Sequence, residues 1–73
     1  MTTGKIRLLD VVALTTDLPT KNLVRGQVGT VVEALAPAVS EVEFCDDRGR
    51  TYAQAAVPNE LLMVLHYEPH QVA

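Results

Sequence analysis

The sequence predicts an all-β domain: a small, five-stranded, partly open barrel with a 3₁₀ turn before its last strand. First, 73 residues leave room for a single domain with a thin core. Second, apolar residues make up 48% of the chain, with one Phe and no Trp, so the core must be built from Val, Leu and Ala. Third, short apolar runs alternate with turn-forming clusters of Gly, Pro, Asp and Asn.

The first half of the chain is organised around Leu23–Glu33, where two glycines three residues apart lead into a β-branched run. We expect a strand over 27–35, with Gly26 and Gly29 serving positive φ, a bulge or close backbone approach. An earlier strand is expected over 8–14, because the segment is short, apolar and contains a Val pair.

The connection between these two strands, 15–25, is about eleven residues long and is expected to be a structured loop. Pro19 prevents a continuous helix here and forces Leu18 towards extended geometry. The apolar side chains expected to fold back onto the core are Leu18, Leu23 and Val24.

The second half begins with a break at Pro37, which suits a hairpin tip. Residues 40–45 alternate apolar and acidic side chains, the strongest period-2 signal in the chain. The following Asp-Asp-Arg-Gly segment predicts a type I turn closed by Gly49 in the left-handed region, and residues 50–57 predict a fourth strand.

The chain ends with a 3₁₀ turn expected over 58–61 and a short strand over 62–65. The domain therefore spans 8–65, between a flexible lead (1–7) and a flexible tail (66–73). The expected core is Val11, Leu14, Val28, Val31, Val42, Phe44, Val57, Leu61 and Val64.

Four segments carry a family resemblance: Asp10-Val-Val-Ala-Leu, Asp17-Leu-Pro, Leu23-Val-Arg-Gly-Gln-Val-Gly-Thr-Val-Val-Glu and Glu41-Val-Glu-Phe. With them, residues 8–65 resemble a bacterial family of standalone small proteins known only as a domain of unknown function. That family is in turn similar to SH3-like barrels of the nitrile hydratase β subunit and electron-transport accessory proteins, through a proline-containing loop followed by Gly-x-x-Gly-x-Val. The same segment is similar to the KOW motif. The resemblance implies a fold and supplies no catalytic residue.

Acidic side chains cluster across the predicted hairpin at Glu33, Glu41, Glu43, Asp46 and Asp47. With Pro37 at its centre, the hairpin places Glu33 near Glu41 on one solvent face. This cluster is either an ordinary solvated face or a patch that docks a basic partner.

Basic side chains lie in the long loop and the hairpin turn: Lys21, Arg25, Arg48 and Arg50. Together with Tyr52 they would form a small cationic, aromatic-edged surface, and the alternative is ordinary surface charge. A nucleic-acid site would need more aromatic residues and a basic excess.

No residue set in the sequence indicates catalysis, a cofactor or a metal. Cys45 is the single cysteine, so no intrachain disulfide can form, and it is expected to be a passive residue at a strand end. His66 and His70 have the i, i+4 spacing of a helical metal site, but Pro69 lies between them. We therefore expect a protein that is not an enzyme.

The net charge of −3 repels phosphate backbones and argues against nucleic-acid binding. No apolar run is long enough for a membrane helix, and the sequence suggests a cytoplasmic protein. The leading hypothesis is a non-catalytic protein-interaction or accessory module. The alternatives are an antitoxin-like or immunity-like protein that neutralises a basic toxin or nuclease, and an RNA-associated KOW-like barrel. The chain is expected to be a monomer or an edge-paired homodimer.

Overall fold

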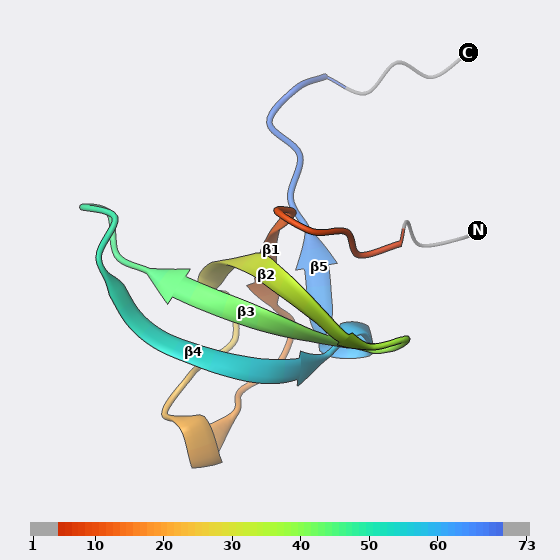
Figure 1. Ribbon diagram of the computed structural model, residues 1–73. Helices are drawn as coiled ribbons and strands as arrows, with labels where there is room; N and C mark the ends of the chain where they lie inside the picture. Colours follow the sequence, from red (N-terminus) through yellow and green to blue (C-terminus); the bar gives the residue numbers. More distant parts are fainter. Residues whose placement is uncertain (1–4, 70–73) are drawn as a thin grey trace.

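The computed structural model describes residues 5–69, which form one antiparallel five-stranded sheet that is not closed (Figure 1). The strands are β1 Val11–Leu14, β2 Val28–Ala36, β3 Val39–Cys45, β4 Thr51–Pro58 and β5 Leu62–Val64. Two 3₁₀ turns, η1 Pro19–Lys21 and η2 Asn59–Leu61, complete the elements. The strand order is β4-β3-β2-β1-β5, and η2 immediately precedes β5. The predicted fold class is confirmed.

The core lies on one face of the curved sheet, which we call the inner face. Its fully buried side chains include Phe44, Leu14, Leu23, Val12, Val31, Val42 and Val57. Five predicted core residues are thus confirmed: Leu14, Val31, Val42, Phe44 and Val57. Leu61 and Val64 are partly buried and pack against the cluster.

The prediction that Val11 and Val28 belong to the core is wrong. Val28 is 42% exposed and Val11 is only half-buried, while Val12 is fully buried in place of Val11. Side chains alternate between the faces of a strand, so the buried Val12 and Val31 put both Val11 and Val28 on the opposite, outer face.

The first strand is shorter than the predicted span of 8–14, because a turn occupies its first residues. The Arg7 amide donates to Asp10 Oδ2 (2.8 Å), and the Asp10 amide donates to the Arg7 carbonyl (3.1 Å). Leu9 adopts φ +70° within this turn, and both Leu8 and Leu9 are exposed. Regular pairing therefore begins only at Val11.

The loop between β1 and β2 is structured, as predicted. Leu18 and Leu23 exchange backbone hydrogen bonds (2.8 and 3.2 Å) and so close a small turn that contains η1. Leu23 is buried and Leu18 packs against the core, but Val24 is 55% exposed. Val24 was predicted to fold inward, but its side chain lies at the surface, and its amide donates a hydrogen bond to Gln27 Oε1 (2.7 Å).

The glycines have the distinct roles that their positions predicted. Gly26 and Gly49 adopt φ +92° and +81°, where a side chain would be strained. Gly29 instead permits close packing, since a Cβ there would lie 2.6 Å from Val42 Cγ1 and 2.8 Å from the Glu43 carbonyl oxygen.

β3 shows the predicted alternation along its whole length, with Ser40, Val42 and Phe44 buried. Ser40 is the buried polar residue, and its hydroxyl donates to Asn59 Oδ1 (2.7 Å). The Asn59 amide also donates to the Ala38 carbonyl (2.8 Å). These two bonds attach η2 to the start of β3 and thereby direct the chain into β5.

Candidate functional site

Three of the predicted acidic residues lie together on the outer face of β2 and β3. Glu33 pairs with Glu41 across the two strands, as the alternation predicted, and Glu43 follows two positions along β3. Gln54 Nε2 donates to Glu41 Oε2 (2.9 Å), and the Thr51 hydroxyl donates to Glu43 Oε2 (2.6 Å). We call Glu33, Glu41 and Glu43 the acidic face. The pairing of β2 with β3 sets the positions of these residues, and hydrogen bonds from neutral side chains of β4 orient the carboxylates of two of them.

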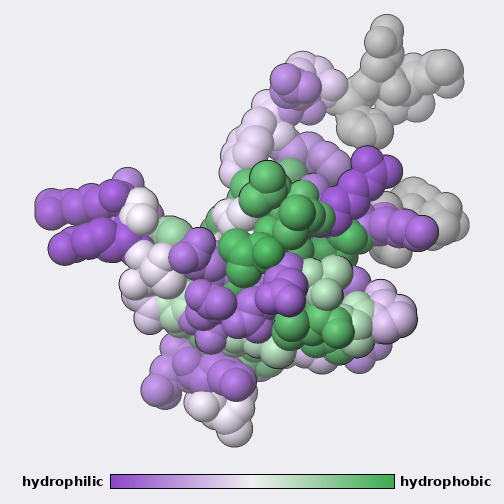
Figure 2. Space-filling view, viewed as in Figure 1, coloured by the Kyte–Doolittle hydropathy of each residue, from purple (hydrophilic) through white to green (hydrophobic). Residues whose placement is uncertain are grey.

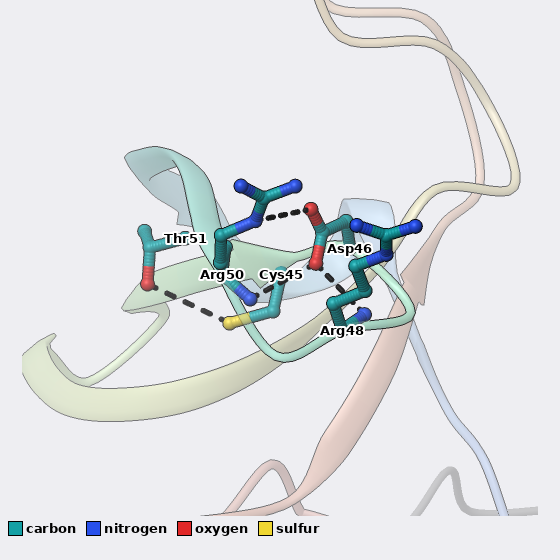
Figure 3. A network of polar contacts seen from close by, with 5 residues as sticks. All are labelled: Cys45, Asp46, Arg48, Arg50 and Thr51. Carbon is teal, nitrogen blue, oxygen red and sulfur yellow. Dashed lines mark hydrogen bonds and ion pairs between the residues drawn. The ribbon is translucent and has the colours of Figure 1, made fainter.

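Asp46 does not belong to this face, because its carboxylate organises the β3–β4 turn (Figure 3). Its Oδ1 accepts the amides of Arg48 and Arg50 (2.9 Å each), and its Oδ2 lies 3.5 Å from Arg50 Nε. The Arg50 amide, followed by the Arg48 amide and the Arg50 side chain, lowers the pKa of Asp46 below its ordinary value. Asp47 is exposed in the same turn. Asp46 therefore belongs to the turn predicted for the Asp-Asp-Arg-Gly segment and not to the acidic face.

The predicted cationic residues come from two separate segments. Lys21 and Arg25 lie in the β1–β2 loop, whereas Arg48 and Arg50 lie in the β3–β4 turn, and Figure 1 shows these two segments apart from each other. The Arg25 amide donates to Asp17 Oδ1 (2.8 Å).

Tyr52 is the aromatic residue predicted to accompany these cations. Gln27 Nε2 donates to its hydroxyl (3.2 Å), and its ring centroid lies 6.4 Å from that of Phe44. The residue is 48% exposed. Tyr52 thus joins β4 to the base of the β1–β2 loop while leaving about half of its surface to solvent.

Sequence reasoning missed an apolar area on the outer face of β5, β1 and β2. Ala13 pairs with Met63 on one side and with Val28 on the other, so the three residues form one cross-strand row. Met63 is 53% exposed and Val28 is 42% exposed. We call Met63, Ala13 and Val28 the apolar row. Figure 2 shows that hydrophobic residues also gather on the face in view.

An open depression of about 430 Å³ adjoins the apolar row. It is lined by Ala13, Leu14, Thr15, Arg25, Gly26 and Met63. The row could not be found from local patterns, because Ala13 and Met63 are brought together by pairing of the first and last strands.

The remaining candidates from the sequence are Cys45 and the two histidines. Cys45 ends β3, half-buried, with Sγ 3.6 Å from Thr51 Oγ1. His66 is exposed after β5, and His70 lies outside the described residues. Within residues 5–69, no three His, Cys, Asp or Glu side chains are grouped as they would be to hold a metal ion.

Over the described part of the chain, no helix has the length and apolar character needed to cross a membrane.

Comparison with known proteins identifies the family of the chain. No curated protein and no solved structure matches the sequence. A family model does match over residues 8–64, which include all five strands. The chain therefore belongs to the family described as "Domain of unknown function (DUF4926)".

Proposed function

We propose that this protein is a non-catalytic interaction module whose outer sheet face binds a basic, partly apolar segment of another protein. The carrying observation is one row of paired residues that crosses the sheet. Val11 pairs with Thr30, Thr30 with Glu43, and Glu43 with Gln54. This row lies next to the apolar row at one end and includes Glu43 of the acidic face towards the other. Apolar and acidic surface therefore adjoin across neighbouring strands.

The charge of the acidic face supports a basic partner. Within residues 5–69 the ion pair found is that between Arg50 and Asp46, so Glu33, Glu41 and Glu43 have no cationic partner there. Like charges directly opposite each other in a sheet are destabilising, and Glu33 faces Glu41 in this way. A cationic side chain from a partner would relieve this repulsion and would be attracted over a distance during encounter.

The apolar row supports a partner that also buries hydrophobic surface. Met63 and Val28 expose about half of their side chains on either side of Ala13, which is itself 5% exposed. Such a row, flanked by polar residues, has the composition of an interface centre with a charged rim. A partner segment with an apolar side chain next to a Lys or Arg would complement both the apolar row and the acidic face.

The test compares partner capture by three forms of the protein at increasing salt. The test variant is Glu33→Gln/Glu41→Gln/Glu43→Gln, which keeps side-chain size and removes three charges. The matched control, Asp47→Asn/Glu60→Gln/Glu68→Gln, removes three exposed carboxylates that lie elsewhere. Because neutralisation removes the Glu33–Glu41 repulsion, the test variant should melt no lower than the parent, which verifies its fold.

We expect the parent and the control to capture the same stoichiometric protein, released at moderate salt, and the test variant to lose it. Equal capture by the test variant would refute a role for the acidic face. Recovery of RNA, or of no partner at all, would refute the proposed function.

We also propose that the domain is related to SH3-like barrels. The strand order β4-β3-β2-β1-β5, the long structured loop between β1 and β2, and η2 immediately before β5 support this relationship. An experimental structure should superimpose on such barrels over all five strands; superposition of the β2–β4 meander alone would refute it.

A further inference from the structure

β4 is an edge strand whose outer side is unpaired in the described structure. It pairs with β3 alone, and Figure 1 shows it as the outermost ribbon of that side of the sheet. Among residues 5–69, the backbone hydrogen bonds outside the strand ladders involve no residue from 51 to 58. The backbone groups of β4 that point away from β3 are therefore available to another strand.

The composition of β4 does not protect this edge. Exposed edge strands usually carry charged side chains, yet the eight residues Thr51–Pro58 include none. A register shift between Phe44 and Cys45 and the proline at position 58 leave 53–57 as the regular part. Five residues is an ordinary length for a paired strand. The opposite edge, β5, has only three residues.

We propose that two copies of this protein pair antiparallel through β4, forming a dimer with a continuous sheet across both subunits. Pairing of 53–57 with itself places Ala55 on the two-fold axis and Gln54 opposite Ala56 of the second copy. The seam then consists of small or neutral side chains, so the backbones can approach without steric conflict or unpaired charge. Two-fold pairing of one segment with itself also closes, so assembly stops at two copies.

The acidic face does not oppose this pairing. Glu41 and Glu43 lie on β3, one strand inward from the edge, opposite Ala56 and Gln54. Three inter-strand spacings of about 4.8 Å separate β3 of one copy from β3 of the other, about 14 Å in total. This exceeds the screening length of about 8 Å at physiological salt. Since each chain has a net charge of −3, dimerisation should strengthen as salt is raised.

Sedimentation equilibrium measures the fraction of dimer as the protein concentration is raised to about 1 mM. At that concentration a dimer with an association free energy of only about 4 kcal/mol is still detectably populated. The test variant Gln54→Glu/Ala56→Glu places carboxylates opposite each other across the seam, on exposed positions of β4 where Glu41 and Glu43 of β3 add to the repulsion. The control Thr16→Glu/Thr20→Glu adds the same charge at exposed positions of the β1–β2 loop. We expect dimerisation to weaken about tenfold or more in the test variant and to persist in the control.

Amide hydrogen exchange of the unmodified protein supplies a second measurement, which does not depend on the variants folding. Amides within 53–57 should exchange more slowly as protein concentration rises, while those of β5 should not change. A chain that stays monomeric over the whole concentration range would overturn the proposal. It would also be overturned by a dimer that persists in the test variant, or by one whose protected amides lie outside β4.

Discussion

The replacement Gly29→Ala tests how closely β2 and β3 pack in the core. The added Cβ would lie 2.6 Å from Val42 Cγ1 and 2.8 Å from the Glu43 carbonyl oxygen, whereas ordinary contacts are about 3.5–4.0 Å. The second contact is with backbone that is held in the β2–β3 ladder, so it cannot be relieved by rotating a side chain.

The expected loss of stability is a net effect of two terms. Overpacking costs about 1–3 kcal/mol, and the smaller freedom of alanine in the unfolded chain returns about 0.4–1 kcal/mol. Because one of the contacts is with backbone that cannot move aside, the overpacking cost lies in the upper part of its range, about 2–3 kcal/mol, and the net loss is about 1–2.6 kcal/mol. This loss is large beside the total of about 4–11 kcal/mol typical of a chain this size. The melting temperature should fall by about 4–20 °C, as measured by circular dichroism.

Gly26 provides the contrasting case, because its φ is +92° and a Cβ there would meet nothing within 4 Å. Asparagine tolerates the left-handed region better than alanine, so Gly26→Asn should destabilise the protein less than Gly26→Ala. At Gly29 the order should reverse, with Gly29→Asn worse than Gly29→Ala because it is larger. A Gly29→Ala variant that melts within about 2 °C of the parent, or the same order at both glycines, would refute the packing argument.

Two further predictions concern the core and the turn. Phe44→Ala should lower the free energy of unfolding by about 3–5 kcal/mol, because the side chain is fully buried; a urea midpoint close to the parent's would contradict this. Asp46→Ala should destabilise at neutral pH, since the carboxylate accepts the amides of Arg48 and Arg50 and has a lowered pKa. A lowered folded-state pKa gives stability that is present above the unfolded pKa of about 3.9 and lost as pH falls through the folded value. The difference in melting temperature between Asp46→Ala and the parent should therefore begin to narrow below about pH 4 and close as pH falls through the lowered pKa of Asp46, and a gap that stays constant to low pH would exclude the charge as its source.

Elements with strong local signals could be predicted from the sequence. The alternation over 40–45 predicted which side chains of β3 face the core, and it predicted the extent of the strand to within one residue, since β3 begins at Val39. The turn before Gly49 and the 3₁₀ turn before β5 also depend on adjacent residues, and both are found. Such features need no knowledge of which distant strands pair.

β1 was less predictable because its facing depends on its neighbours. Val11 and Leu14 were both assigned to the core, but residues three apart in a strand lie on opposite faces. The pairing of Val12 with Gly29 and Val64 resolves the choice, and it involves residues far away in the sequence. The four-residue strand is too short for its own pattern to decide.

The candidate site was predictable only in part for the same reason. Glu33 and Glu41 are joined by a tight hairpin, so their proximity followed from local geometry. The apolar row requires Met63 to meet Ala13, which only the pairing of the two ends of the domain accomplishes. The turn that begins at Asp46 was predicted from its spacing to Gly49, but Asp46 was also counted in the acidic cluster, because the bonds of its carboxylate to the turn amides were not foreseen.

The closed turn between Leu18 and Leu23 makes the loop tip a suitable insertion point. Its neck is held by two backbone hydrogen bonds and by the buried Leu23, while no residue of η1 is buried. Lengthening a loop above such a neck adds only about 0.6 kcal/mol of closure entropy for each doubling. A foreign peptide placed between Thr20 and Lys21 would be displayed on a rigid base, which makes this domain a compact carrier for grafted sequences.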